Sequence, residues 1–123
     1  MASNKAIRLG PVAVANSVGN LFNPPTLTGG TNPPASSTNS YYVIRHIRIV
    51  NKTAGAVTFS GYIGATGASA AGTEFLGNGL SVAANSYVDW YGVLRLDTAD
   101  FLTGVAGAAT SLTIEAEGEM GIA

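Results

Sequence analysis

The sequence predicts an all-β protein, an antiparallel β-sandwich or jelly roll with an extended Pro-rich N-terminal arm. Three observations favour this fold class. Apolar and polar residues alternate along several short segments, and these segments recur at intervals of roughly 8–12 residues with turn residues between them. No segment shows an apolar stripe at helical period for more than one turn. Short alternating strands separated by turns are typical of sandwiches and jelly rolls.

Residues 1–40 form the predicted arm, and residues 41–123 form the predicted sandwich domain. Within the arm, residues 5–9 and 12–14 could each make a short strand, with a break at Gly10-Pro11. Four of the five prolines lie between residues 23 and 40, among many Ser, Thr, Asn and Gly residues. Because such a stretch is a poor central strand, we interpret it as an extended arm or a loop laid over a surface, with a flexible linker as the alternative.

The central strand is predicted over residues 41–51. This is the longest apolar, β-branched and aromatic run in the chain, and it contains no Gly or Pro. Arg45 interrupts the apolar set, which leaves two alternatives. We favour a regular strand with Ile47 and Ile49 facing inward; in the other alternative a bulge near Arg45 and His46 brings Ile44 to the core side.

The residues after the central strand divide into further turns and strands. Asn51-Lys52-Thr53 fits a glycosylation sequon, but without a secretion signal we interpret it as the start of a turn. Residues 56–64 alternate as a half-buried strand antiparallel to the central one. Trp90 is expected to be the largest core anchor. The other expected elements are a loop over 65–73, with a helix as the weaker option, a turn over 77–79, and strands over 86–96, 101–105 and 111–120.

The composition predicts a thin core. The hydrophobic fraction is 46%, but much of it is Ala, and with 16 Gly the large apolar side chains are few. Ordering the backbone costs roughly 1–2 kcal/mol per residue, so such a core is expected to need neighbouring subunits. We therefore expect a homo-oligomer, with a trimer favoured. Charged residues make up only 11%, which predicts a surface of uncharged polar groups or of contacts with other proteins.

The sequence argues against several classes of partner and of site chemistry. A net charge of −1 with only six Lys and Arg argues against nucleic acid as a partner, because binding phosphates requires clustered cations. No run is long and apolar enough to suggest a membrane as a partner. The absence of Cys excludes disulfides, thiolate metal sites and cysteine nucleophiles. The chain start lacks the apolar region of a secretion signal, so we expect the protein to stay in a cytoplasm until it assembles.

The few titratable groups do not predict an enzyme. We assign no catalytic residue, no cofactor site and no metal site. His46 is the single histidine, and no nucleophile elbow or triad context surrounds it, so a surface or subunit contact is the better interpretation. Glu115, Glu117 and Glu119 share one strand face and could in principle bind Ca²⁺ or do acid–base work. We interpret them instead as a solvated face with cross-strand ion pairs, for which the candidate partners are Arg45, Arg48 and Arg95.

Five tyrosines are numerous for a chain of this size. They could stack on a sugar or a base, but strand tyrosines more often pack in a sheet or at a subunit interface.

Three phrases of the sequence carry a family resemblance. They are residues 42–51 (YVIRHIRIVN), 62–64 (YIG) and 82–91 (VAANSYVDWY). On these residues the chain resembles small virion structural proteins of tailed bacteriophages. The resemblance implies a β-sandwich in the virion, assembled in the host cytoplasm and contacting the major capsid protein or other virion proteins. A capsid decoration or cement protein that binds capsomers is the leading hypothesis; the alternative is a neck, tail or fibre component that binds a receptor or glycan.

Overall fold

The computed structural model describes residues 5–22, 40–65, 67, 69, 71–97 and 100–122. These residues form eight strands and no helix. No helix in the described part of the chain could therefore cross a membrane. The strands are β1 (Lys5–Val14), β2 (Gly19–Phe22), β3 (Ser40–Asn51), β4 (Val57–Gly64), β5 (Leu80–Val82), β6 (Tyr87–Leu96), β7 (Phe101–Ala106) and β8 (Leu112–Ile122).

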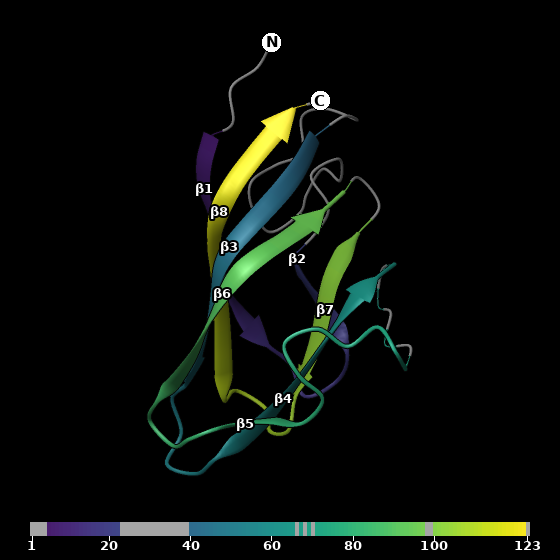
Figure 1. Ribbon diagram of the computed structural model, residues 1–123. Coiled ribbons are helices and arrows are strands. Elements are labelled where there is room, and N and C mark those ends of the chain that lie inside the picture. The colour runs from purple at the N-terminus through teal and green to yellow at the C-terminus, as the bar shows by residue number, and fades with distance from the viewer. Residues whose placement is uncertain are drawn as a thin grey trace.

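The strands form two four-stranded antiparallel sheets that face each other (Figure 1). Sheet A has the order β1-β8-β3-β6, and sheet B has the order β2-β7-β4-β5. Every link along the chain crosses from one sheet to the other except the link between β4 and β5. This strand order is that of an eight-stranded jelly roll. The predicted all-β antiparallel fold class is confirmed, and of its two forms the topology is the jelly roll.

β3 is the central strand of sheet A, as predicted, and it lies between β8 and β6. Its register shifts between Ile44 and His46 against both neighbours, with Arg45 between them. Ile44 and Ile47 are both buried although they are three residues apart, which a regular strand would not allow. The favoured prediction of a regular strand is therefore wrong, although Ile47 and Ile49 do face the core; the bulge at Arg45 is present.

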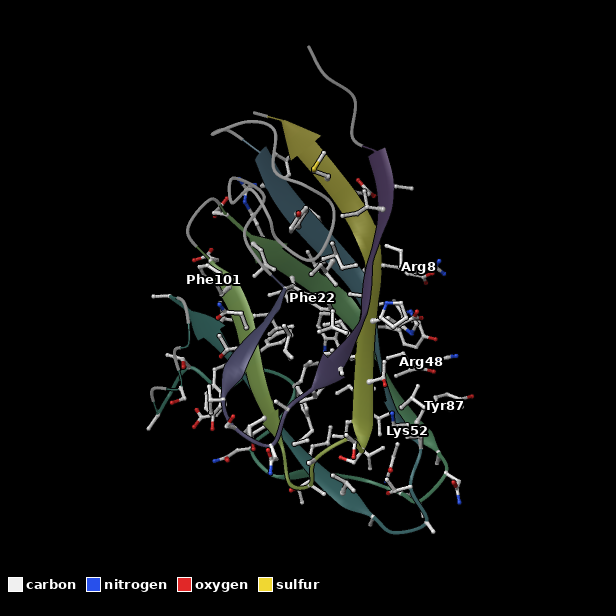
Figure 2. The ribbon with its side chains drawn as sticks, turned by 180° about the vertical axis from the view of Figure 1, so that it is seen from behind. Arg8, Phe22, Arg48, Lys52, Tyr87 and Phe101 are labelled. Carbon is white, nitrogen blue, oxygen red and sulfur yellow. The ribbon has the colours of Figure 1, made fainter. Side chains whose placement is uncertain are left out.

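The core lies between the two sheets. Tyr42, Phe22 and Phe59 are its largest fully buried side chains, and Figure 2 shows Phe22 between the layers. Trp90 is only partly buried, whereas Leu94 and Leu96 on the same inward side of the edge strand β6 are buried. The ring of Trp90 meets Phe75 edge to face, with centroids 5.0 Å apart. The prediction that Trp90 is the largest core anchor is therefore wrong.

The turn after β3 carries the chain from sheet A to sheet B. Its organiser is the buried side chain of Asn51. Asn51 Oδ1 accepts hydrogen bonds from the backbone N and the Oγ1 of Thr53, at 2.9 and 2.7 Å. Asn51 Nδ2 donates to the carbonyl oxygens of Gly55 and Val82, at 2.9 and 3.0 Å. The predicted turn is confirmed, and the amide nitrogen that a glycan would need is enclosed within it.

β4 is not the hairpin partner of β3. It pairs with β5 and β7 in sheet B, because the Asn51 turn changes sheets instead of reversing within one. The prediction that residues 56–64 lie antiparallel beside the central strand is therefore wrong. Alternation along β4 could not have revealed this, since a strand on either sheet buries one face.

Residues 5–22 of the first forty belong to the jelly roll. β1 pairs with β8 and β2 with β7, and they contribute the buried side chains of Leu9, Val14, Leu21 and Phe22. The break at Gly10-Pro11 appears as a register shift within β1, so the two short strands predicted there are one. Residues 23–39, which hold most of the prolines, lie outside the described residues, and their role as an arm stays a prediction.

Candidate functional site

Charged side chains of the strands are confined to sheet A. β2, β4, β5 and β7 contain no Asp, Glu, Lys, Arg or His, so sheet B presents none from its strands. In sheet A, the outward positions of β8, β3 and β6 carry carboxylates, an imidazole, guanidinium groups and tyrosine rings. We call this set the outer face of sheet A; Figure 2 shows Arg8, Arg48 and Tyr87 projecting from the outer side of the sheet.

His46 lies at the centre of this face, directly after the β3 bulge. Its Nε2 is 2.9 Å from Asp89 Oδ1 on β6, and its Nδ1 is 3.3 Å from Glu117 Oε1 on β8. The imidazole also stacks on Tyr91, with ring centroids 4.7 Å apart and planes 19° from parallel. One side chain therefore connects all three adjacent strands. The bulge makes this possible, because it turns His46 outward while Ile44 and Ile47 stay in the core.

Arg48 and Asp89 form the second connection between β3 and β6. Arg48 Nε donates to Asp89 Oδ1 at 2.7 Å and Arg48 Nη2 to Oδ2 at 3.1 Å, a bidentate pair. These bonds, followed by the one from His46, lower the pKa of Asp89 to about 2. The hydrogen bond with Asp89 raises the pKa of His46 against the opposing effect of burial, with Glu117 adding to the rise. The same carboxylate raises the pKa of Arg48.

The predicted glutamate row faces outward on β8, as expected. Glu119 Oε2 is 3.1 Å from Arg45 Nε, and Glu117 contacts His46. Glu115 is the register partner of Arg48, whose guanidinium turns to Asp89 instead. Arg95 pairs with Asp97 at 2.8 Å and not with the row. Among the described residues no group of three His, Cys, Asp or Glu could hold a metal ion.

Tyrosine rings cover two guanidinium groups of this face. The Arg48 Cζ atom lies 4.2 Å from the centroid of the Tyr87 ring, and the Arg95 Cζ atom lies 4.2 Å from that of Tyr41. Such contacts are cation–π interactions. Tyr91 and Tyr87 remain 72% and 53% exposed. One side of each ring therefore contacts a neighbouring side chain, while much of the residue meets solvent. Sequence reasoning placed these tyrosines on strands but missed their pairing with cations, which depends on the register.

The arrangement suits binding better than proton transfer. Both ring nitrogens of His46 are engaged by carboxylates, so neither points at a substrate position. A general base needs a free nitrogen within hydrogen-bond reach of the proton that it removes. What the face does offer is a set of preordered, mutually neutralised polar groups with exposed aromatic rings, a composition found at protein interfaces.

Comparisons with known proteins give limited likenesses. No family model and no curated sequence matches the chain. Among solved structures, a Bacillus endospore appendage pilus subunit matches with 14% identity and a TM-score of 0.44, over 98% of this chain and 85% of its own. PirA matches with 15% identity and a TM-score of 0.37, over 97% and 94%. The particle protein of the extra small virus of the prawn Macrobrachium rosenbergii matches with 8% identity and a TM-score of 0.41, over 96% and 76%. At these TM-scores the likenesses support no functional inference.

Proposed function

We propose that this chain is a structural protein of a bacteriophage virion, a capsid decoration or cement protein that binds capsomers and stabilises the head. The observation that carries the proposal is the strand order β1-β8-β3-β6 facing β2-β7-β4-β5. The eight-stranded jelly roll is a fold of viral capsid domains. The sequence resemblance to small virion proteins of tailed phages supports the assignment to a phage particle.

The surface chemistry supports a role in assembly. Several charges of the outer face of sheet A are paired within the sheet, as Arg48 with Asp89 and Arg45 with Glu119. Such pairs can be covered by a protein partner without leaving single buried charges, which would be costly. Weak contacts of this kind become durable when symmetry repeats them around a shell. The proposal therefore includes no enzymatic activity and no cofactor, and its partners are capsid or other virion proteins.

The proposal is tested by adding the purified protein to phage heads assembled without it. We expect saturable binding at symmetry-related sites and a rise in the temperature at which the heads release their genome. Heads that bind no protein, and that lose none of their stability when it is missing, would contradict the cement function. Sedimentation of heads with bound protein measures the first quantity, and dye access to the packaged genome during heating measures the second.

The proposed role of the arm needs a narrower deletion than the whole of residues 1–40. Removing that segment would also remove β1 and β2 with their buried side chains, so the jelly roll would not fold. A Gly-Ser linker of equal length in place of residues 23–39 leaves both strands in the chain. We expect this variant to fold and to lose head binding; unchanged binding would show that the segment makes no contact with the head.

Exposed aromatic rings favour one second candidate, a receptor- or glycan-binding module of the neck, tail or a fibre. Tyr91 and Tyr87 present solvent-facing rings that His46 and Arg48 hold in place. The jelly roll is also a lectin fold, and aromatic rings can stack on sugars. Glycan arrays and binding to host cells separate the two functions: a cement protein binds heads and no glycan, whereas a receptor module binds glycans or cells.

A further inference from the structure

The four edges of the two sheets differ in how they are protected. Exposed edge strands can pair with another chain, and proteins protect them by keeping them short, bulged or interrupted by proline. β5 has three residues, and β2 has four with a register shift. β1 is long, but Gly10-Pro11 shifts its register at mid-strand, and proline has no N–H to donate. β6 has ten residues and no proline; its register shifts against β3 between Tyr91 and Leu94, and among the described residues its strand partner is β3 alone.

β6 also presents apolar side chains along its outward positions. The outward residues are Tyr87, Asp89, Tyr91, Val93 and Arg95, with Gly92 also exposed between Tyr91 and Val93. Tyr91 and Val93 are 72% and 67% exposed, more than any other large hydrophobic residue in the described part of the chain. On the inward side, Val88 and Trp90 are only partly buried against the core. A strand added beside β6 would cover residues on both of its faces.

The outward residues of β6 are complementary to themselves. In an antiparallel pair of β6 strands with Gly92 opposite Gly92, Asp89 of one copy lies opposite Arg95 of the other. In the same register Tyr91 lies opposite Val93. Opposite charges and aromatic with β-branched residues are the favourable cross-strand pairs, and each occurs twice because of the two-fold symmetry.

Two other registers lack this complementarity. With Tyr91 opposite Tyr91, the carboxylate of Asp89 faces Val93. With Asp89 opposite Asp89, two like charges meet directly, which is unfavourable. In the Gly92 register, Asp89 and Arg95 also have unused hydrogen-bonding positions for the contact with each other. Asp89 accepts three hydrogen bonds from Arg48 and His46 and a carboxylate offers about four acceptor sites, while Arg95 donates to Asp97 through Nε and retains its terminal nitrogens.

We propose that β6 is the contact between two copies of this chain, paired antiparallel about a two-fold axis at Gly92 so that the two A sheets form one continuous eight-stranded sheet. The inward residues extend the core across the axis, with Trp90 opposite Leu94 of the second copy. A closed ring of three would need two different surfaces in contact, whereas β6 pairs with itself. The expected form of the free protein is therefore a dimer, in place of the trimer favoured from the sequence.

The contact is tested by measuring the mass of the purified protein over a wide concentration range by sedimentation equilibrium. Wild type is expected to be a dimer that dissociates reversibly on dilution. Val93→Asp places a carboxylate beside Asp89 of the second copy and removes the pair with Tyr91, twice per dimer, so it is expected to weaken dimerisation by about tenfold or more. Val18→Asp, at another exposed valine outside β6, adds the same charge and should leave dimerisation unchanged.

Cysteine pairs test the register. The natural chain contains no cysteine, so introduced thiols can pair only with each other. Residues directly opposite in an antiparallel pair lie within the Cα separation that a disulfide allows. Tyr91→Cys mixed with Val93→Cys is expected to give a cross-linked heterodimer on oxidation, whereas each variant alone should stay largely uncrosslinked.

Each outcome of these experiments decides the proposal. A wild-type monomer at every concentration, a trimer, or a dimer that Val93→Asp and Val18→Asp affect equally would overturn it. Efficient cross-linking of Tyr91→Cys with itself would overturn the register. Circular dichroism and thermal unfolding of Val93→Asp confirm that the variant is folded. The proposal does not depend on the virion function, because self-association is measured on the free protein and head binding on particles.

Discussion

The two sheets of this jelly roll have similar interiors and very different exteriors. The strands of sheet A have 10 to 12 residues, and ion pairs and ring contacts connect their outward side chains. The strands of sheet B have 3 to 8 residues and contain no charged residue. Close approach at glycines occurs in both sheets: a Cβ atom on Gly61 of sheet B would lie 2.5 Å from the carbonyl oxygen of Phe75, and one on Gly118 of sheet A would overlap the carbonyl oxygen of Val43.

This difference between the exteriors indicates that the two sheets have different roles. Sheet B contributes packing to the fold, and its strands carry no charged group for recognition. Sheet A contributes packing through its inward face and carries, on its outer face and on the β6 edge, the groups able to bind a partner. The predictions below test this division from the largest expected effect to the smallest.

Phe22→Ala should give the largest loss of stability. Phe22 is fully buried on β2, the edge of sheet B that lies within the first forty residues. Truncation of a buried phenylalanine costs about 3–5 kcal/mol in the free energy of unfolding. Val18→Ala, at a valine that is 39% exposed, should cost much less. Urea denaturation measures both, and equal small losses would contradict the position of β2 in the common core.

Gly61→Ala should destabilise the protein by about 1–3 kcal/mol, because its Cβ would overlap the backbone oxygen of Phe75 and force strand and loop apart. Gly55→Ala is the matched control, since no atom lies within 4 Å of the position of its Cβ. The free energy of unfolding of the control should stay near that of wild type. If both variants behave alike, close approach at Gly61 does not hold the edge of sheet B.

The polar network of sheet A should be visible in the titration of the single histidine. In wild type the pKa of His46 should exceed 6.5. Asp89→Asn should lower it more than Glu117→Gln, because the hydrogen bond that His46 donates to Asp89 is the larger cause of the rise. NMR titration of the imidazole protons measures all three pKa values. The reverse order would show that Glu117, and not Asp89, is the principal partner.

The same network predicts a small dependence of stability on pH. Because folding raises the pKa of His46, its contribution is fully present below about pH 6.5 and is lost as the pH rises through the folded value. Folding lowers the pKa of Asp89, so its contribution is present above about pH 4 and is lost as the pH falls through about 2. The stability advantage of wild type over His46→Gln should therefore shrink between pH 6 and 9. An advantage that grows over this range would contradict the assignment.

Much of the fold could be predicted from local sequence pattern. The errors of that prediction have identifiable physical causes. Alternation located the longer strands and the shared face of Glu115, Glu117 and Glu119, because a half-buried strand must show period two; the short strands β2 and β5 were not predicted. It misplaced β4, since which sheet a strand joins depends on the direction of a turn, here set by the side chain of Asn51. It overrated Trp90, because residue size does not reveal how much of an inward side chain the core covers.

The candidate site was predictable in its residues but not in its contacts. The outward positions of Glu117 and Glu119 follow from parity, and cross-strand pairing with arginine was expected. The cluster of His46 with Asp89, Glu117 and Tyr91 depends on the register shift at Arg45, which sets the residues of β6 and β8 that lie opposite His46. A bulge has no strong signal in a single sequence beyond a charged residue within an apolar run, and Arg45 is such a residue.

The most direct test of the account is the position of this protein in the intact particle, determined by cryo-electron microscopy with symmetry averaging. The account predicts density for the two-layered jelly roll at repeated sites in contact with capsomers, and loss of that density from particles made without the protein. Particles whose density contains no such domain, together with a protein that stays entirely in the soluble fraction of infected cells, would contradict it.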